Sequence, residues 1–151
     1  LAQAYSVFAN DGVLQPVTLL AEGLTPRPTR IFKSETVAQI LPMLEAVTEQ
    51  GGTATKARVG LYRVGGKTGT TMKLVSGSYA SQQYVSSFVG LAPMSKPRFV
   101  MAVVVDDPRS QDYYGGQVAA PVFADVMDDV MRIYDIAPDQ SEMPVLAQGV
   151  R

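Results

Sequence analysis

Apolar positions recur at helical spacing in two stretches of the first third of the chain. Between Leu1 and Phe8 they occupy positions i, i+3, i+4 and i+7, and Asn10-Asp11-Gly12 supplies a stop. A second apolar stripe runs from Val37 to Val47, with Ser34 as the expected N-cap. Because Pro42 removes a backbone donor within this stripe, we expect a kink or a break in the helix there.

The clearest helical pattern lies near the end of the chain. Pro121 suits the first turn of a helix, and two adjacent apolar rows follow it with an acidic face opposite. The rows are Val122, Val126, Val130 and Phe123, Met127, Met131, and the opposite face carries Asp125, Asp128, Asp129 and Arg132. We expect the apolar rows to cover a sheet.

Strand patterns fill the region between these helices. Tyr84 to Ala92 is bounded by a proline, and Phe99 to Val105 is a β-branched run closed by Asp106-Asp107-Pro108. Together with an extended segment at Gly65 to Thr70, they predict three consecutive antiparallel strands and an α+β fold. A continuous apolar run is typical of a strand buried on both faces, so Phe99 to Val105 is expected at the centre of the sheet.

Polar and small residues dominate the remaining stretches. Thr71 to Gln83 is rich in Ser, Gly and Gln, which favours a long flexible connection. Gln111 to Gly116 reads as a mobile loop that carries an aromatic pair. Residues 139–151 are polar and lack periodicity, so they are expected to form a flexible tail after a folded unit at 1–138.

Composition excludes several kinds of chemistry. The 151 residues are 46% hydrophobic and 18% charged, which is typical of one globular domain. A net charge of -1 with 13 scattered basic residues argues against a nucleic-acid surface. Since the sequence contains no Cys and no His, a cysteine nucleophile, a Ser-His-Asp triad and a thiolate zinc site are excluded within it, and no metal or cofactor is predicted.

The stretch Gly65-Gly66-Lys67-Thr68-Gly69-Thr70 is the candidate binding site. On an extended strand Thr68 and Thr70 share one face and Lys67 points to the other, so two hydroxyls meet one ligand, which suits an anion. Gly69 removes a side chain where another backbone can approach closely. A Gly-rich edge strand with one exposed lysine explains the same residues without any ligand, and spacing alone supports both interpretations equally.

A nucleotide-binding P-loop is a weaker interpretation of the same lysine. Gly66-Lys67-Thr68 matches the end of that motif, and Val103 to Asp106 resembles its magnesium-binding strand. However, Leu61 stands where the motif requires glycine, and Gly69-Thr70-Thr71 is a poor helix start. Thr53-x-x-Lys56 imitates a nucleophile with a lysine base, but the glycines before it favour a loop.

Lys67-Thr68-Gly69 is also the Lys-Thr-Gly motif of serine penicillin-binding proteins and class A β-lactamases. Other landmarks follow in the order and spacing of class B penicillin-binding proteins. They are Leu1-Ala2-Gln3-Ala4-Tyr5 up to Asn10-Asp11-Gly12, Gly51-Gly52-Thr53, Ser87-Phe88-Val89-Gly90, Tyr113-Tyr114-Gly115-Gly116 and Ala120-Pro121-Val122-Phe123. From Leu1 to about Asp139 the chain therefore resembles the C-terminal half of the family's transpeptidase domain, and most of all that of the division-specific D,D-transpeptidase that builds the septum.

The resemblance implies a partial penicillin-binding fold, similar to that of serine β-lactamases, in which a long C-terminal helix covers antiparallel strands. It also implies a serine that attacks the penultimate D-Ala carbonyl of a stem peptide and is acylated by β-lactams. Thr68 and Thr70 would bind the substrate or β-lactam carboxylate, and the Thr70 backbone N–H would form half of the oxyanion hole. Lys67 would polarise a serine of the second family motif, and Tyr113 and Tyr114 match an aromatic wall beside the ligand.

The chain departs from the family in one large respect. It contains no Ser-x-x-Lys, and no Ser-x-Asn in a helical context, so no nucleophile is predicted in it. We expect a truncated, inactive part of a parent enzyme, with a non-catalytic interaction module of the same fold as the alternative. The resemblance places the parent in the bacterial inner membrane, with its anchor outside this sequence and its catalytic domain on the periplasmic or extracellular side. Stem peptides, β-lactams and membrane proteins of the division machinery are the implied partners, and exposed sheet edges favour dimerisation or strand exchange.

Overall fold

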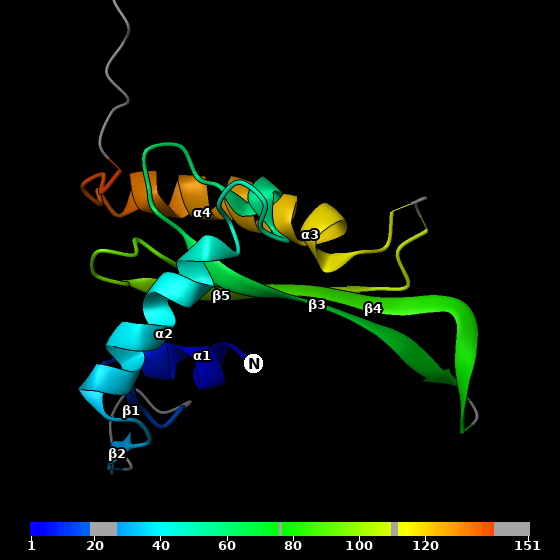
Figure 1. Ribbon diagram of the computed structural model, residues 1–151, viewed down its shortest axis with the longest axis horizontal. Coiled ribbons are helices and arrows are strands. Elements are labelled where there is room, and N and C mark those ends of the chain that lie inside the picture. The colour runs from blue at the N-terminus through cyan, green and yellow to red at the C-terminus, as the bar shows by residue number, and fades with distance from the viewer. Residues whose placement is uncertain (19–26, 76, 110–111, 141–151) are drawn as a thin grey trace, which may run out of the picture.

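A computed structural model describes residues 1–18, 27–75, 77–109 and 112–140, which form helices on both faces of an antiparallel sheet (Figure 1). Helices α3 (Gly115–Val118) and α4 (Ala120–Ile133) lie on one face. Helices α1 (Ala2–Ala9) and α2 (Ser34–Ala46) pack on the other, next to the short strands β1 (Val13–Leu14) and β2 (Thr29–Arg30). The predicted α+β class is confirmed.

The main sheet consists of β3 (Gly65–Val75), β4 (Ser78–Ala92) and β5 (Phe99–Asp106), in the order β3-β4-β5. Both pairs are antiparallel, as predicted for three consecutive strands. A 3-10 turn, η1 (Thr55–Ala57), lies in the connection between α2 and β3. Ala54, just before this turn, and Ala57, its last residue, are fully buried, so the connection is anchored in the core.

Side chains of β4 alternate between two hydrophobic cores. Phe88 faces α4 and meets Phe123 edge to face, with ring centroids 5.0 Å apart. Leu91 faces the opposite side, where it packs with Leu44 of α2 and Met94. The central strand is therefore buried on both faces, because helices of the two layers cover it from either side.

The prediction that Phe99 to Val105 is the central strand is wrong. Among the described residues β5 lies at one edge of the sheet, and β4 takes the centre. Alternate residues of β5 pack on the α4 core, whereas Val104 on the other face is 58% exposed. Val100 on that other face still packs on the second core, beside α1. A run of apolar residues does not distinguish a central strand from an edge strand that helices cover.

The prediction of a flexible connection from Thr71 to Gln83 is also wrong. β3 and β4 continue through it as a hairpin, with Thr71 opposite Val85 and Leu74 opposite Tyr79. Figure 1 shows this hairpin reaching past the end of β5. Both faces of the outer hairpin are open to solvent, so it carries a polar composition that resembles that of a loop.

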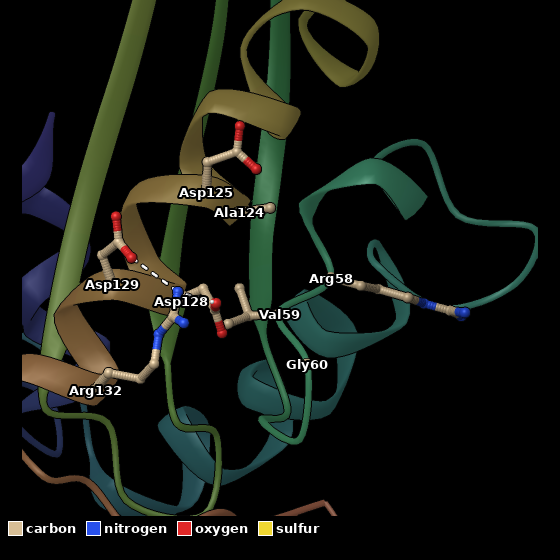
Figure 2. A pocket seen from close by; sticks show the side chains of 8 residues that line it. All are labelled: Arg58, Val59, Gly60, Ala124, Asp125, Asp128, Asp129 and Arg132. Carbon is tan, nitrogen blue, oxygen red and sulfur yellow. Dashed lines mark hydrogen bonds and ion pairs between the residues drawn. The ribbon is translucent and has the colours of Figure 1, made fainter.

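Helix α4 shows its acidic face in Figure 2, where Arg132 pairs with Asp129. The same guanidinium lies 2.7 Å from the carboxylate of Asp128. Of the two predicted core rows, only the one with Phe123, Met127 and Met131 is buried. Val122 and Val126 are 45% and 43% exposed, because a helix that packs on a sheet along one line buries a single stripe.

Helix α2 differs from its prediction at two points. Lys33 is the N-cap, and the Ser34 hydroxyl instead donates to the Asp11 carboxylate at 2.6 Å. Pro42 does not break the helix, which runs on to Ala46. The stripe still packs as expected, with Val37 and Leu44 buried.

The segment after α4 is bound to the approach to β3. The Asp139 carboxylate accepts the backbone N–H groups of Arg63 at 2.7 Å and Ser95 at 2.9 Å. Gln140 N–H donates to the Leu61 carbonyl at 2.9 Å. These two residues therefore belong to the folded unit, and the rest of the predicted tail lies outside the described residues.

Candidate functional site

Alternation along β3 places Thr68 and Thr70 on the face that α3 covers. Thr68 lies opposite Phe88 and Thr70 opposite Ser86 in the register of the sheet, which confirms that the two threonines share a face. They open onto a pocket of about 330 Å³ between β3, the start of α3 and the loop after α2. The other residues that line it are Gly52, Thr53, Tyr114, Gly115, Gly116 and Gln117.

Both threonine hydroxyls are held by hydrogen bonds that leave protons for a ligand. Gly115 N–H donates to Thr70 Oγ1 at 3.1 Å, so this oxygen acts as an acceptor and its own proton stays available. Thr68 Oγ1 lies 3.1 Å from Thr53 Oγ1. One of these two hydroxyls donates its proton to the other, so the second hydroxyl keeps its proton for a ligand. The pocket thus offers hydroxyl donors and no lining carboxylate, which suits an anionic ligand.

The pocket has its shape because glycines allow α3 to approach the strand. A Cβ on Gly115 would lie 2.6 Å from the Gly69 carbonyl oxygen, and one on Gly116 would lie 1.9 Å from that of Thr53. At Gly69 itself a Cβ would meet the Ser87 hydroxyl at 2.5 Å. The predicted close backbone approach therefore occurs, but it is Gly115 that permits it, while Gly69 makes room for a side chain.

Lys67 lies on the other face of β3, as the alternation predicts, and does not line the pocket. Its register partner is Val89, and its ammonium donates to the neighbouring Thr68 carbonyl at 2.9 Å. The side chain is exposed. Among the described residues its ammonium makes no hydrogen bond to a serine.

Tyr113 and Tyr114 stand beside the pocket as a stacked pair. Their ring centroids are 4.5 Å apart, and the Tyr113 hydroxyl donates to that of Tyr114 at 3.2 Å. Tyr113 is fixed further by the Ser86 hydroxyl, which donates to its carbonyl. The hydrogen bond with Tyr113, the electrostatic interaction with that phenol and desolvation together raise the pKa of Tyr114. Of these two tyrosines, Tyr114 lines the threonine pocket and Tyr113 does not.

The P-loop interpretation is excluded by the backbone after Thr68. A phosphate-binding lysine loop leads into a helix, but here the chain continues as strand to Val75. Asp106, the supposed magnesium ligand, forms an ion pair with Lys73 at 2.8 Å. The described part of the chain also holds no cluster of three or more acidic, His or Cys side chains that could bind a metal.

Thr53 belongs to the site, although the sequence did not predict it there. Its hydroxyl reaches that of Thr68 across fifteen positions of the chain. The signal available was the Gly51-Gly52-Thr53 landmark, which gives no direction for a hydroxyl. Gly116 and Gln117 also line the pocket without having been predicted to, because the docking of α3 brings them to the strand.

Comparison with known proteins adds independent information. The model of the penicillin binding protein transpeptidase domain matches residues 1–128. The chain is 40% identical over 151 residues to the probable peptidoglycan D,D-transpeptidase PenA of Neisseria meningitidis serogroup A. It is 35% identical over 139 residues, or 92% of its length, to the peptidoglycan D,D-transpeptidase FtsI of Escherichia coli K12. It covers 26% and 24% of these proteins, so it spans about a quarter of their length.

Solved structures give the same result for the fold. The TP domain of penicillin-binding protein 3 from Burkholderia pseudomallei, in its apo form, superposes with a TM-score of 0.82 at 42% identity. The match covers 93% of this chain and 43% of that one.

No helix in the described residues is long and apolar enough to cross a bilayer.

Proposed function

This chain belongs to the penicillin-binding protein transpeptidase family, and on that basis we propose that it is the carboxylate-binding part of a peptidoglycan D,D-transpeptidase. The observation that carries the proposal is the convergence of Thr68, Thr70 and Thr53 on one pocket that no carboxylate lines. A terminal D-Ala carboxylate, or its β-lactam mimic, would accept the hydroxyl protons of this pocket.

The pocket would position the reacting carbonyl as well as bind the substrate. Hydrogen bonds from Thr68 and Thr70 to the terminal carboxylate would place the penultimate D-Ala carbonyl beside β3. There the Thr70 backbone N–H would stabilise the oxyanion that forms when a serine attacks. Lys67 would lie next to the partner serine of the second family motif and favour the negatively charged substrate.

We assign the nucleophilic serine to a part of the intact protein outside these residues. The 151 residues contain no Ser-x-x-Lys. The chain covers only 43% of the related TP domain, which leaves the larger part of that domain to supply the missing motifs. On this proposal the intact protein cross-links stem peptides through an acyl-serine, whereas these residues alone bind a carboxylate without reacting.

Labelling with a fluorescent penicillin tests this proposal. The intact protein should become covalently labelled, and a polypeptide of only these 151 residues should not. Labelling of the isolated chain would contradict the assignment of the serine. A correctly folded intact protein that resists labelling would instead favour a non-catalytic interaction module with the same fold.

The finer assignment is to septal cell-wall synthesis. It is supported by the resemblance of the sequence landmarks to division-specific transpeptidases and by the 35% identity with FtsI. It implies a membrane-anchored parent that acts outside the inner membrane with other division proteins. Cells whose only copy carries Lys67→Ala should form filaments without septa. Loss of wall elongation with normal septa would refute the septal assignment and leave the transpeptidase proposal standing.

A further inference from the structure

Two hydroxyls lie side by side across the inner part of the β3–β4 hairpin, on the face that α3 covers. Thr70 of β3 and Ser86 of β4 are register partners, so their side chains point to the same face of the sheet. Thr70 lines the threonine pocket, whereas Ser86 is fully buried. A buried hydroxyl costs free energy unless it is hydrogen-bonded, so the partner of Ser86 shows what this side chain does in the fold.

Both hydroxyls bind the short segment Tyr113-Tyr114-Gly115, in opposite senses. Ser86 donates to the Tyr113 carbonyl, and Thr70 Oγ1 accepts from the Gly115 N–H at 3.1 Å. Tyr114 lies between these two hydrogen bonds and is the N-cap of α3. One hydrogen bond from each strand therefore anchors the segment, on either side of the residue from which α3 starts.

The packing of Gly115 leaves little freedom between the two anchors. A Cβ on Gly115 would lie 2.2 Å from the Ser87 carbonyl oxygen and 2.6 Å from that of Gly69, so its backbone lies directly against both strands. Gly115 itself is buried. Because Tyr113 is only two residues away, a shift of its carbonyl would move the Gly115 N–H relative to Thr70.

The Gly115 N–H determines how the Thr70 hydroxyl is used. A threonine hydroxyl has one proton and rotates to suit its partners, so its direction follows from the groups around it. While Gly115 donates to Thr70 Oγ1, the proton of this hydroxyl is free for a ligand in the pocket that Thr70 lines. Without this donor the hydroxyl would be free to rotate and would present its lone pairs to a carboxylate part of the time.

We propose that Ser86 is a positioning residue that sets the preference of the threonine pocket for a free carboxylate. Its hydroxyl holds the Tyr113 carbonyl, this bond fixes the Gly115 N–H, and that N–H keeps the Thr70 proton directed at the ligand. Ser86 does not line the pocket, so its effect on the ligand passes through Thr70. The inference rests on the proposed function, since it requires that Thr70 binds the carboxylate of a stem peptide or a penicillin.

Acylation rates separate an effect through Thr70 from a general loss of packing. Second-order rates of the intact protein would be measured for a penicillin with its free carboxylate and for its methyl ester. In Ser86→Ala the free acid should react about fivefold more slowly, the worth of one hydrogen bond, and the rate with the ester should change by less than about twofold. Ser86→Cys keeps the volume of the side chain but has only a weak donor, so it should show the same change.

A double variant shows whether the two residues act together. Thr70→Val lacks the hydroxyl that Ser86 is proposed to orient, so the addition of Ser86→Ala should slow the reaction with the free acid no further. A further fivefold loss in the double variant would overturn the proposal. Equal losses for acid and ester in Ser86→Ala and Ser86→Cys, or rates like those of the unmodified protein in both, would overturn it as well.

Thr48→Val is the matched control for the loss of a buried hydroxyl. Thr48 is 1% exposed, and its hydroxyl donates to the Val64 carbonyl at 2.7 Å, outside the pocket lining. This variant should lower the melting temperature as Ser86→Ala does, but it should keep the ratio of the acid and ester rates. An altered ratio in Thr48→Val would contradict a specific path through Ser86. Absence of acylation in the unmodified protein, or equal rates for its acid and ester, would instead refute the proposed function itself.

Discussion

The same two strands, β3 and β4, behave differently in their inner and outer halves. In the inner half Phe88 is fully buried beneath α4, and the facing Thr68 opens onto the pocket. In the outer half Met72, Leu74 and Tyr79 are 49%, 65% and 71% exposed. Backbone pairing continues through both halves, with a register irregularity between Met72 and Leu74. Packing, and not pairing, therefore distinguishes the part of the hairpin that binds from the part that projects.

This difference indicates which part of the hairpin holds its side chains rigidly enough to bind a ligand. A hydroxyl that must hold a carboxylate needs a backbone that does not move, and helices on both faces of the inner sheet supply this constraint. Residues of the outer hairpin belong to neither hydrophobic core, and Lys73 ties it to β5 only by an ion pair with Asp106, so it should open with little cost.

Removing the buried ring should have the largest effect. Phe88→Ala deletes a side chain with no exposed surface that packs on Phe123, and should lower the stability of the intact protein by about 3–5 kcal/mol. Leu74→Ala in the outer half should change stability by less than about 0.5 kcal/mol. Thermal melting of both variants checks this. Equal losses would mean that the outer hairpin is packed in the intact protein.

A methyl group at the pocket should act on binding and stability together. In Gly116→Ala the new Cβ would meet the Thr53 carbonyl oxygen at 1.9 Å, so α3 must shift, at a cost of about 1–3 kcal/mol. We expect penicillin acylation to slow at least tenfold. Gly77→Ala at the hairpin turn meets no atom within 4 Å and has only the strain of its φ of +83°. Normal acylation by Gly116→Ala would show that α3 does not shape the pocket.

Removing the hydroxyl that the sequence did not reveal should have a smaller effect. Thr53→Val keeps the shape but removes the partner of Thr68 Oγ1, a hydrogen bond worth about 1 kcal/mol. Acylation by penicillin should slow about fivefold, without a change in melting temperature beyond a few degrees. Thr55→Val, two residues on in η1 and outside the pocket lining, is the matched control. If Thr53→Val were acylated as fast as Thr55→Val, Thr53 would have no part in binding.

The smallest expected effect is a loss of stability of the outer hairpin at high pH. The hydrogen bond to Asp106 raises the pKa of Lys73, with desolvation opposing it and the charges of Asp106 and Asp107 adding to it. A raised lysine pKa contributes stability that is fully present below the ordinary value, about pH 10.4, and that is lost as pH rises through the folded value. Hydrogen exchange at the outer hairpin should therefore quicken in strongly alkaline solution, after correction for intrinsic rates. Lys73→Met should remove this pH step, and Lys96→Met should retain it.

Local patterns predicted the elements more successfully than their surroundings. The strands at Tyr84 and Phe99 and the helix at Pro121 follow from periodicity, because the alternation of side chains is a property of each segment. The position of β5 at the sheet edge and the exposure of Val122 on α4 depend on which other elements pack against them. Such neighbours are set by tertiary packing, which a single segment does not encode.

The site shows the same limit. Thr68 and Thr70 were found because they belong to one strand with period two. Thr53 and Gln117 were missed because their approach to that strand depends on how two loops and α3 dock. The outer hairpin was mistaken for a loop because it has no buried face, so its strands lack the apolar alternation that identifies strands elsewhere.

Thr70 provides the sharpest test of the carboxylate pocket. Second-order acylation rates of the intact protein would be compared for a penicillin with its free carboxylate and for its methyl ester. Thr70→Val should slow the reaction with the free acid about 10- to 100-fold, the worth of a hydrogen bond to a charged group, and should affect the ester far less. Thr71→Val, on the opposite face of β3, should react like the unmodified protein. Equal losses for acid and ester in Thr70→Val, or a similar loss in Thr71→Val, would contradict carboxylate binding at this strand.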